Sequence, residues 1–292
     1  MRDRRARARE AVLGAVVADA AACGLHWIYD VEEVARRGGD APEFAHPKAN
    51  RYHGRRKPGE LTHYGDHVLV VLESMAERGG FDPDDYRERY VARFGAKGYD
   101  GYLDHATKDL LKLGTGSDDD HAGCLAKLPA LVARYGDDPE LAARIEVAVR
   151  VTHDNGEAVA YSLAAAKAIR IAILGGSPAQ AVAAVAEGGG GPASRVQAVL
   201  GAGADHTAFA AEIGQSCPVP NAVPAALHAA LHATDLKSCV RQENVAGGDT
   251  SGRLLLSAAI RGATDGVPED WLARLSARKR AEELVDRVLA AL

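Results

Sequence analysis

Alanine-rich apolar runs are the feature that most constrains how this chain can fold. One long example covers residues 157–174 and ends at Gly175-Gly176. Hydrophobic residues make up 47% of the 292 residues, much of this share is alanine, and aromatic residues are only 5%. Alanine is the best helix former, and small side chains let helices pack closely. The sequence therefore predicts an all-α, compact multi-helix bundle and argues against a sandwich or barrel.

A glycine-rich break at residues 188–191 is the most plausible internal hinge. The segments on both sides are helical and similar in composition, so we expect one domain over residues 1–292.

The charge distribution narrows the class of protein. The formal net charge is −5, which argues against general affinity for nucleic acid. A basic start at residues 2–9 followed by the apolar run 11–25 imitates a signal peptide, but Asp19 interrupts the run, which is also too short to span a membrane. Four distant cysteines form no CxxC pair and fit reduced, mostly buried thiols. We expect a cytoplasmic protein without membrane contact.

The stretch Gly247-Gly248-Asp249-Thr250-Ser251-Gly252-Arg253 is the first candidate site element. Two glycines allow a sharp turn and close approach to a ligand, and an apolar helical run follows. Asp249 could simply cap this helix, or its free oxygen could hold a hard cation or a sugar hydroxyl. The heptapeptide alone leaves both readings open.

The second candidate element is the polar cluster of residues 61–67, which precedes the almost entirely apolar helical run 68–75. An apolar helix is expected in the middle of a bundle, and it would carry His63, Tyr64 and Asp66 into the interior or a cleft. Asp19, within an apolar segment, must likewise be hydrogen-bonded or functional.

Three further polar features leave alternatives open. Asp118, Asp119 and Asp120 precede an expected helix, so at least one is expected to cap it, although three together also resemble a cation or ribose site. The loop-rich stretch up to about residue 60 is long enough to be functional, but most of it reads as a surface excursion. His228 and His232, at i,i+4, are better explained as core or surface histidines than as metal ligands.

With these pieces placed, the chain resembles the ADP-ribosylglycohydrolase family, including its J1-crystallin-like branch. Five fragments match in order: the Gly/Ala-rich first helix 14–20, the Thr-Asp-Asp-Thr region at 62–74, the Thr-His turn at 152–153, the Gly-Gly-Asp-Thr signature at 247–250 and the near-terminal Pro-x-x-Trp close at 268–271. The resemblance implies a compact orthogonal bundle of a dozen or more helices. It also implies a central cleft in which two magnesium ions position ADP-ribose for cleavage at the anomeric carbon.

The metal motif departs from the family pattern. Thr62 and Asp249 are unchanged, but His63 and Tyr64 replace two aspartates, Ser251 replaces a third, and Gly252 replaces a threonine. His121 and Ala126 stand where the family usually has Asn and Arg. Asp66 could compensate in part. We therefore expect one magnesium ion or none.

From the residues and the resemblance together, the sequence predicts a site. The catalytic candidates are Asp66 and Asp249; the substrate-binding candidates are Asp19, His63, Tyr64, His121, His153 and Arg253; the metal candidates are Thr62, Asp66, Asp249 and Ser251. Arg253 could neutralise the two acids or bind a phosphate.

Two functions fit this site. The first is a hydrolase that cleaves the glycosidic bond at the anomeric carbon of ADP-ribose or a related ribosylated substrate, small or protein-linked. The second is a non-catalytic relative, either a ribosyl- or nucleotide-binding module or a crystallin-like structural protein that has lost the binuclear metal site. The weakened metal motif favours the second function, and the surviving polar residues at helix starts favour the first. The sequence does not give the oligomeric state.

Overall fold

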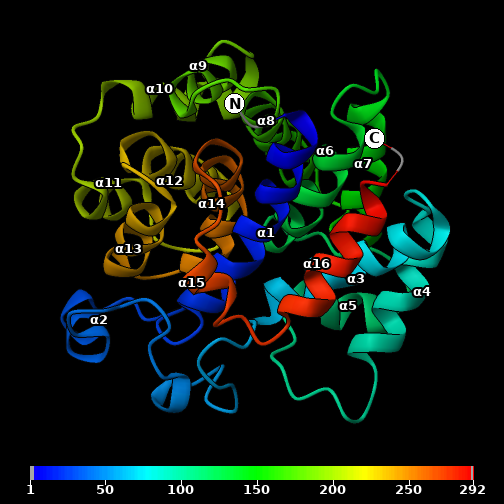
Figure 1. Cartoon of the computed structure of the whole chain (residues 1–292), viewed down its shortest axis with the longest axis horizontal. Coiled ribbons are helices and arrows are strands. Elements are labelled where there is room, and N and C mark those ends of the chain that lie inside the picture. The colour runs from blue at the N-terminus through cyan, green and yellow to red at the C-terminus, as the bar shows by residue number, and fades with distance from the viewer. Residues whose placement is uncertain (1–2, 291) are drawn as a thin grey trace.

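The computed structural model describes residues 3–290 and 292, and these fold as an all-α bundle (Figure 1). Its sixteen α-helices are α1 (Arg4–Ala22), α2 (Val31–Gly38), α3 (His63–Arg78), α4 (Pro83–Phe94), α5 (His105–Leu113), α6 (Leu128–Tyr135), α7 (Leu141–Thr152), α8 (Gly156–Ile173), α9 (Pro178–Ala186), α10 (Gly190–Gly201), α11 (His206–Ile213), α12 (Val219–His232), α13 (Leu236–Ala246), α14 (Thr250–Asp265), α15 (Glu269–Leu272) and α16 (Arg278–Val288). Two 3₁₀ helices, η1 (Pro47–Ala49) and η2 (Ala122–Lys127), complete the set. The described residues form three isolated β-bridges and no sheet, so the predicted all-α class is confirmed.

The central pair of helices is α1 and α14, and glycines let their backbones approach closely. A Cβ atom at Gly14 would lie 2.6 Å from the carbonyl oxygen of Ala258, and one at Gly262 would lie 2.3 Å from that of Glu10. Both distances are too short for real Cβ contacts, so only glycine fits. Figure 1 shows α1 in the middle of the molecule beside α14.

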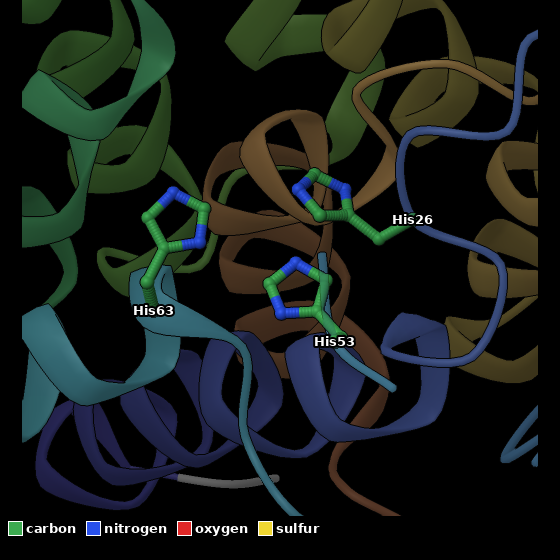
Figure 2. A group of neighbouring side chains, drawn as sticks. All are labelled: His26, His53 and His63. Atoms are coloured by element: carbon green, nitrogen blue, oxygen red, sulfur yellow. The ribbon is translucent and has the colours of Figure 1, made fainter. Parts of the chain in front are cut away.

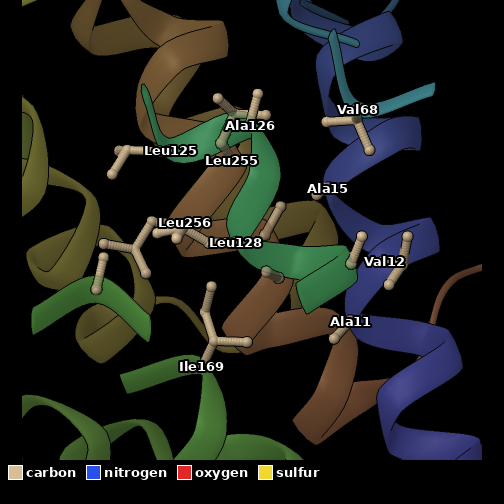
Figure 3. Close-up of a cluster of buried hydrophobic side chains, with 14 of the residues drawn as sticks. Ala11, Val12, Ala15, Val68, Leu125, Ala126, Leu128, Ile169, Leu255 and Leu256 are labelled. Carbon is tan, nitrogen blue, oxygen red and sulfur yellow. The ribbon is translucent and has the colours of Figure 1, made fainter. Parts of the chain in front are cut away.

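The apolar helix α3 is buried, as its sequence predicts. Residues 63–72, Ser74 and Met75 are all buried. Val68 belongs to the largest cluster of buried apolar side chains, which extends from Ala8 to Leu289. Figure 3 shows part of this cluster, in which Val12 of α1, Ile169 of α8 and Leu255 of α14 take part. Small and branched side chains fill the space between the helices.

Several chain segments meet at one end of α1. The turn after α1 pairs with the glycine turn before α14, because Gly248 donates to the carbonyl oxygen of Ile28 (2.7 Å) and Trp27 donates to that of Gly248 (2.8 Å). The N-terminus of α3 is tied to the same end, since the Thr62 N–H donates to Asp19 of α1 (2.8 Å). The fold thus brings together both candidate site elements, although they lie almost two hundred residues apart.

Other sequence-based expectations can be compared with the described residues. None of their helices combines the length and apolar character needed to cross a bilayer. All four cysteines are free thiols, and three of them are buried. The capping prediction for the aspartate triplet was inexact: His121 holds the N-cap position of η2, and Asp119 accepts the N–H of His121 (2.7 Å) rather than a helical one.

Candidate functional site

A cavity of about 210 Å³ opens at the end of the bundle where these segments meet. The residues that line it differ in chemistry. Five aromatic side chains, here called the aromatic wall, line it together with four acidic or imidazole side chains, here called the acidic wall, and one thiol: Trp27, Tyr29, Tyr52, Tyr64 and Tyr102; Asp104, His105, Asp119 and His121; Cys217. Two of the predicted site residues, Tyr64 and His121, therefore lie at the cavity. No lysine or arginine is among these lining residues.

Trp27 separates the cavity from the interior behind it. Its backbone has φ = 62°, an unusual left-handed conformation for a bulky residue. The hydrogen bond from its N–H to Gly248 holds this conformation, and its indole Nε1–H donates to Asp249 Oδ1 (3.0 Å). Tyr52 and Tyr102 each pack edge-on against the indole at 4.9 Å. The ring is therefore fixed by contacts on several sides.

Asp249 lies directly behind this aromatic wall. It occupies the N-cap position of α14 but makes no capping hydrogen bond, so the simple cap reading fails. Its side chain is fully buried; Oδ1 accepts from Trp27, and Oδ2 has no hydrogen-bond partner. Burial raises the pKa of Asp249 to about 6, and the Arg253 guanidinium opposes the rise. Asp249 is thus a buried acid that is only partly compensated.

The turn that presents Asp249 depends on the two preceding glycines. Gly247 and Gly248 have φ values of 72° and 75°, which favour glycine. A Cβ atom at Gly248 would lie 2.3 Å from the carbonyl oxygen of Gln215. The Asp249 N–H donates to that same carbonyl (2.9 Å). The geometry of the turn therefore requires both glycines, as the sequence indicated.

Asp66 faces a different environment. Its carboxylate binds Arg56 (2.7 Å) and accepts from the Tyr99 hydroxyl (2.9 Å), and Arg93 lies 3.6 Å away. It is not among the residues that line the cavity. The structure thus does not bring Asp66 and Asp249 together on two walls of one cavity; Asp66 instead anchors the loop that carries Arg56.

The predicted metal residues also make separate contacts. Both the N–H and the hydroxyl of Thr62 donate to Asp19, which is fully buried and whose pKa burial raises to about 7. The Ser251 N–H donates to a ring nitrogen of His26, and its hydroxyl lies close enough to Asp19 to lower the pKa of that carboxyl. Thr62 and Ser251 thus share Asp19 as a neighbour, whereas Asp66 and Asp249 form their hydrogen bonds with other groups.

Arg253 is buried behind the glycine turn. Its Nε donates to Glu243, and its terminal nitrogens donate to the carbonyl oxygens of Gly247 (2.7 Å) and Gln215 (3.3 Å). Because the side chain is fully buried, these donors are not directed to a phosphate in the cavity. The sequence suggested a ligand contact; the structure instead uses Arg253 to hold the turn that carries Asp249.

Three buried imidazoles lie beneath Trp27: His26, His53 and His63, here called the three-histidine cluster (Figure 2). His26 follows α1, His63 begins α3, and His53 comes from the loop between η1 and α3. Asn50 ties that loop to the cluster, since it donates to the carbonyl oxygen of His26 (2.7 Å) and accepts the N–H of His53 (3.0 Å). Burial lowers the pKa of each of these imidazoles, that of His63 to about 3.

Sequence reasoning missed two members of this region. His53 belongs to the loop that was read as a surface excursion, and no local pattern marks it. Asp104 lines the cavity, caps α5 by accepting the N–H of Thr107 (2.8 Å), and lies 3.9 Å from Nε2 of His63. An aspartate directly before a helical run was a capping signal that the sequence offered.

The acidic wall contains two carboxylates in unlike environments. Burial alone would raise the pKa of Asp104, but the imidazoles of His67, His63 and His153 shift it below its usual range. Burial raises the pKa of Asp119, opposed by the N–H and ring of His121. His153 is buried beside this wall without lining the cavity, and its Nδ1 bonds to Thr152 (2.8 Å).

The residues present do not fit a pair of magnesium ions. Magnesium requires oxygen ligands in near-octahedral geometry. Among the described His, Cys, Asp and Glu residues, two groups of three bring ligand atoms within 4.8 Å of one another: the three-histidine cluster and Asp119-Asp120-His121. The first offers only nitrogen, and neither contains Asp66 or Asp249. A binuclear magnesium centre of the family type is therefore not supported by this ligand set.

Comparisons with known proteins identify the family and the fold to which this chain is similar. The sequence model of the ADP-ribosylglycohydrolase family matches residues 1–292. Crystallin J1A of Tripedalia cystophora is 28% identical over 96% of this chain and 94% of its own length, and Crystallin J1B of the same organism is 31% identical over 58% and 59%. A solved structure described as an ADP-ribosylglycohydrolase-related protein complex aligns over 99% of both chains with a TM-score of 0.75 and 25% identity.

Proposed function

The chain belongs to the ADP-ribosylglycohydrolase family, and from this premise we propose that it hydrolyses a glycosidic bond at the anomeric carbon of a ribosylated compound. Family membership supports a glycosyl-hydrolase type of role. The observation that carries the finer proposal is the cavity itself, which is lined by aromatic side chains together with Asp104 and Asp119.

The two wall carboxylates suit this chemistry. Cleavage at an anomeric carbon develops positive charge on the sugar ring, and one carboxylate stabilises it while the other donates or accepts a proton. Carboxyl groups whose environments move their pKa values apart can divide these roles. The lowered pKa of Asp104 keeps it anionic, which suits charge stabilisation, and the raised pKa of Asp119 suits proton transfer.

The size of the cavity limits how much of the substrate it can enclose. The cavity volume of about 210 Å³ is small compared with the roughly 300–1,000 Å³ of a pocket for a whole drug-sized ligand. An aromatic and acidic lining without Lys or Arg suits a ribosyl group and a neutral or cationic leaving group better than a diphosphate. Exposed Lys108 and Arg51, which lie over the rings of Tyr102 (5.0 Å) and Tyr52 (5.7 Å), could meet phosphates outside the cavity.

The direct test is hydrolysis of a panel of ribosylated compounds, with and without the ADP portion, followed by release of the free sugar. Asp119→Asn should lower kcat by about 10²–10⁴-fold, the usual contribution of general acid–base catalysis. Asp118→Asn is the matched control, because that neighbouring carboxylate bonds to Asn155 and does not line the cavity. Equal rates for the two variants would remove Asp119 from the reaction.

A second candidate function has its own support. Two relatives are named crystallins, and His63, Tyr64 and Ser251 stand where the family's metal motif has aspartates. In a purely structural protein, no member of the panel would be hydrolysed, and none would raise the melting temperature. Binding without turnover would instead indicate a ribosyl-binding module.

A further inference from the structure

We propose that the three-histidine cluster binds one transition-metal ion of the zinc type, in place of the magnesium pair that the family resemblance implies. The three rings are 0%, 1% and 0% exposed and come from three separate segments of the chain. In Figure 2 the rings lie around a common space, and each turns a nitrogen toward it. This inference stands apart from the hydrolase proposal, because metal content is measured without any substrate.

The hydrogen bonds of the cluster carry the argument. Five of its six ring nitrogens are buried without a hydrogen-bond partner: Nε2 of His26 and both nitrogens of His53 and His63. Buried polar groups in folded proteins are nearly always satisfied, so each exception requires an explanation. A buried imidazole without a counter-ion is neutral, and the free lone pair of a neutral imidazole is a metal ligand. One bound ion would satisfy one nitrogen from each ring at once.

The spacing of the rings fits a single ion. Ring centroids lie 5.3 Å apart for His26–His53, 5.7 Å for His53–His63 and 6.1 Å for His26–His63. In a tetrahedral site with zinc–nitrogen bonds of about 2.1 Å, the centroids of two imidazole ligands lie about 5 Å apart. The rings therefore need to close by about an ångström or less. A set of imidazoles suits zinc, copper, iron or nickel, whereas magnesium prefers oxygen.

The groups around the cluster can orient the ligands. A ligating histidine usually donates its second N–H to an oxygen acceptor. In His63 the acceptor would be Asp104, which lies 3.9 Å from Nε2 and is not hydrogen-bonded to it in this structure; Nδ1 is then left for the metal. Asp249 provides negative charge nearby, because its Oδ1 lies 3.6 Å from Nε2 of His26.

His26 must change its tautomer to take part. Its Nδ1 accepts the Ser251 N–H (3.2 Å), which places the ring proton on Nε2, the nitrogen that faces the cluster. Metal binding at Nε2 requires the proton on Nδ1, so the hydrogen bond from the Ser251 N–H must break, and the Thr250 hydroxyl, 3.5 Å from Nδ1, is the group that would accept the ring proton instead. Thr250 is thus a positioning residue, and the inference gains a second, independent test.

The experiment uses the full chain without a histidine tag, stripped with a chelator, equilibrated with Zn²⁺ or Mg²⁺ and desalted. Mass spectrometry of the metal content should give about one zinc and no retained magnesium per chain. Cobalt substitution should give the visible absorption of tetrahedral Co²⁺ with nitrogen ligands. His53→Gln and His63→Gln should each weaken Zn²⁺ binding by about 100-fold or more, and Thr250→Val by roughly 10-fold.

The matched control is His228→Gln, a buried histidine of another cluster whose Nε2 already bonds to the carbonyl oxygen of Gly203 (2.8 Å). This variant should keep the full zinc content. Circular dichroism separates loss of the site from loss of the fold; if both cluster variants unfold, the cobalt spectrum of the wild type decides alone. Absence of zinc from the folded wild type, or equal zinc in the folded cluster variants, would overturn the proposal.

Discussion

This bundle contains two groups of buried histidines, and they differ in whether their ring nitrogens have hydrogen-bond partners. His206 and His228 bond to each other through Nδ1 (3.2 Å), while their second nitrogens bond to Glu243 (3.2 Å) and to a backbone carbonyl. In the three-histidine cluster, five of six ring nitrogens have no partner. The first arrangement closes on itself and explains its own burial. In the second arrangement, the ring nitrogens would be satisfied only by a bound ligand.

The buried carboxyl groups near the two histidine groups also differ in whether neighbouring charges compensate their burial. Burial tends to raise the pKa of Glu243, but Arg253 and His206 hold it below its usual value. Asp19 and Asp249, near the three-histidine cluster, have their pKa values raised by burial to about 7 and about 6. Compensated burial indicates a structural network, and uncompensated burial indicates a place prepared for a ligand or for chemistry.

The largest effect should come from breaking the compensated network. Arg253→Met leaves Glu243 charged and buried without its main partner, so the free energy of unfolding should fall by about 3–5 kcal/mol. Chemical denaturation followed by circular dichroism measures this. Arg241→Met is the control, because the Arg241 side chain is 55% exposed and water can replace it beside Glu43, so the pair should contribute about 1 kcal/mol or less. Similar losses in both variants would contradict the distinction.

A smaller stabilisation should follow from completing the uncompensated cluster. Zinc at about a hundred times its dissociation constant should add roughly 2.7 kcal/mol to the stability of the wild type. Magnesium at the same concentration should add nothing. The same denaturation experiment, repeated with His53→Gln, should show no zinc effect; stabilisation that persists in this variant would assign the metal to another part of the chain.

Removing one histidine from each group compares them directly in the absence of metal. His206→Gln weakens a hydrogen bond to buried Glu243 and should cost about 1–3 kcal/mol. His53 has no hydrogen bond from its ring to lose, so His53→Gln should cost less. Equal costs in paired denaturation curves would mean that the ring nitrogens of His53 have protein partners after all.

The last comparison concerns the slope of stability against pH. Asp19 has a pKa of about 7 when folded and an ordinary value of 3.8, so the folded chain binds the proton more tightly between these limits. Its contribution to stability is present below about pH 4 and declines as pH rises toward 7, by at most about 1.4 kcal/mol per pH unit. Asp19→Asn mimics the protonated acid and should flatten this decline. An unchanged slope in unfolding measurements between pH 4 and 7 would show that Asp19 ionises normally.

The sequence predicted the helical fold, whereas the site that it predicts is still untested. Alanine-rich periodicity and ordered motifs were enough for the helical class, because those signals are local. The motifs around residues 62–67 and 247–253 lie at the end of the bundle where the cavity opens. Asp66 and Arg253 were named as site residues for their charge, but their direction depends on Arg56 and Glu243, which lie elsewhere in the chain. His53 is inaccessible to such reasoning, since only the folded loop places it beside His26.

The most direct test of the account is a crystal structure of the full chain soaked with Zn²⁺, with diffraction data collected on both sides of the zinc absorption edge. We expect one anomalous peak beneath Trp27, about 2.1 Å from a nitrogen of each of His26, His53 and His63. Ordered water in that space without an anomalous peak, or a peak only at Asp119-Asp120-His121, would contradict it.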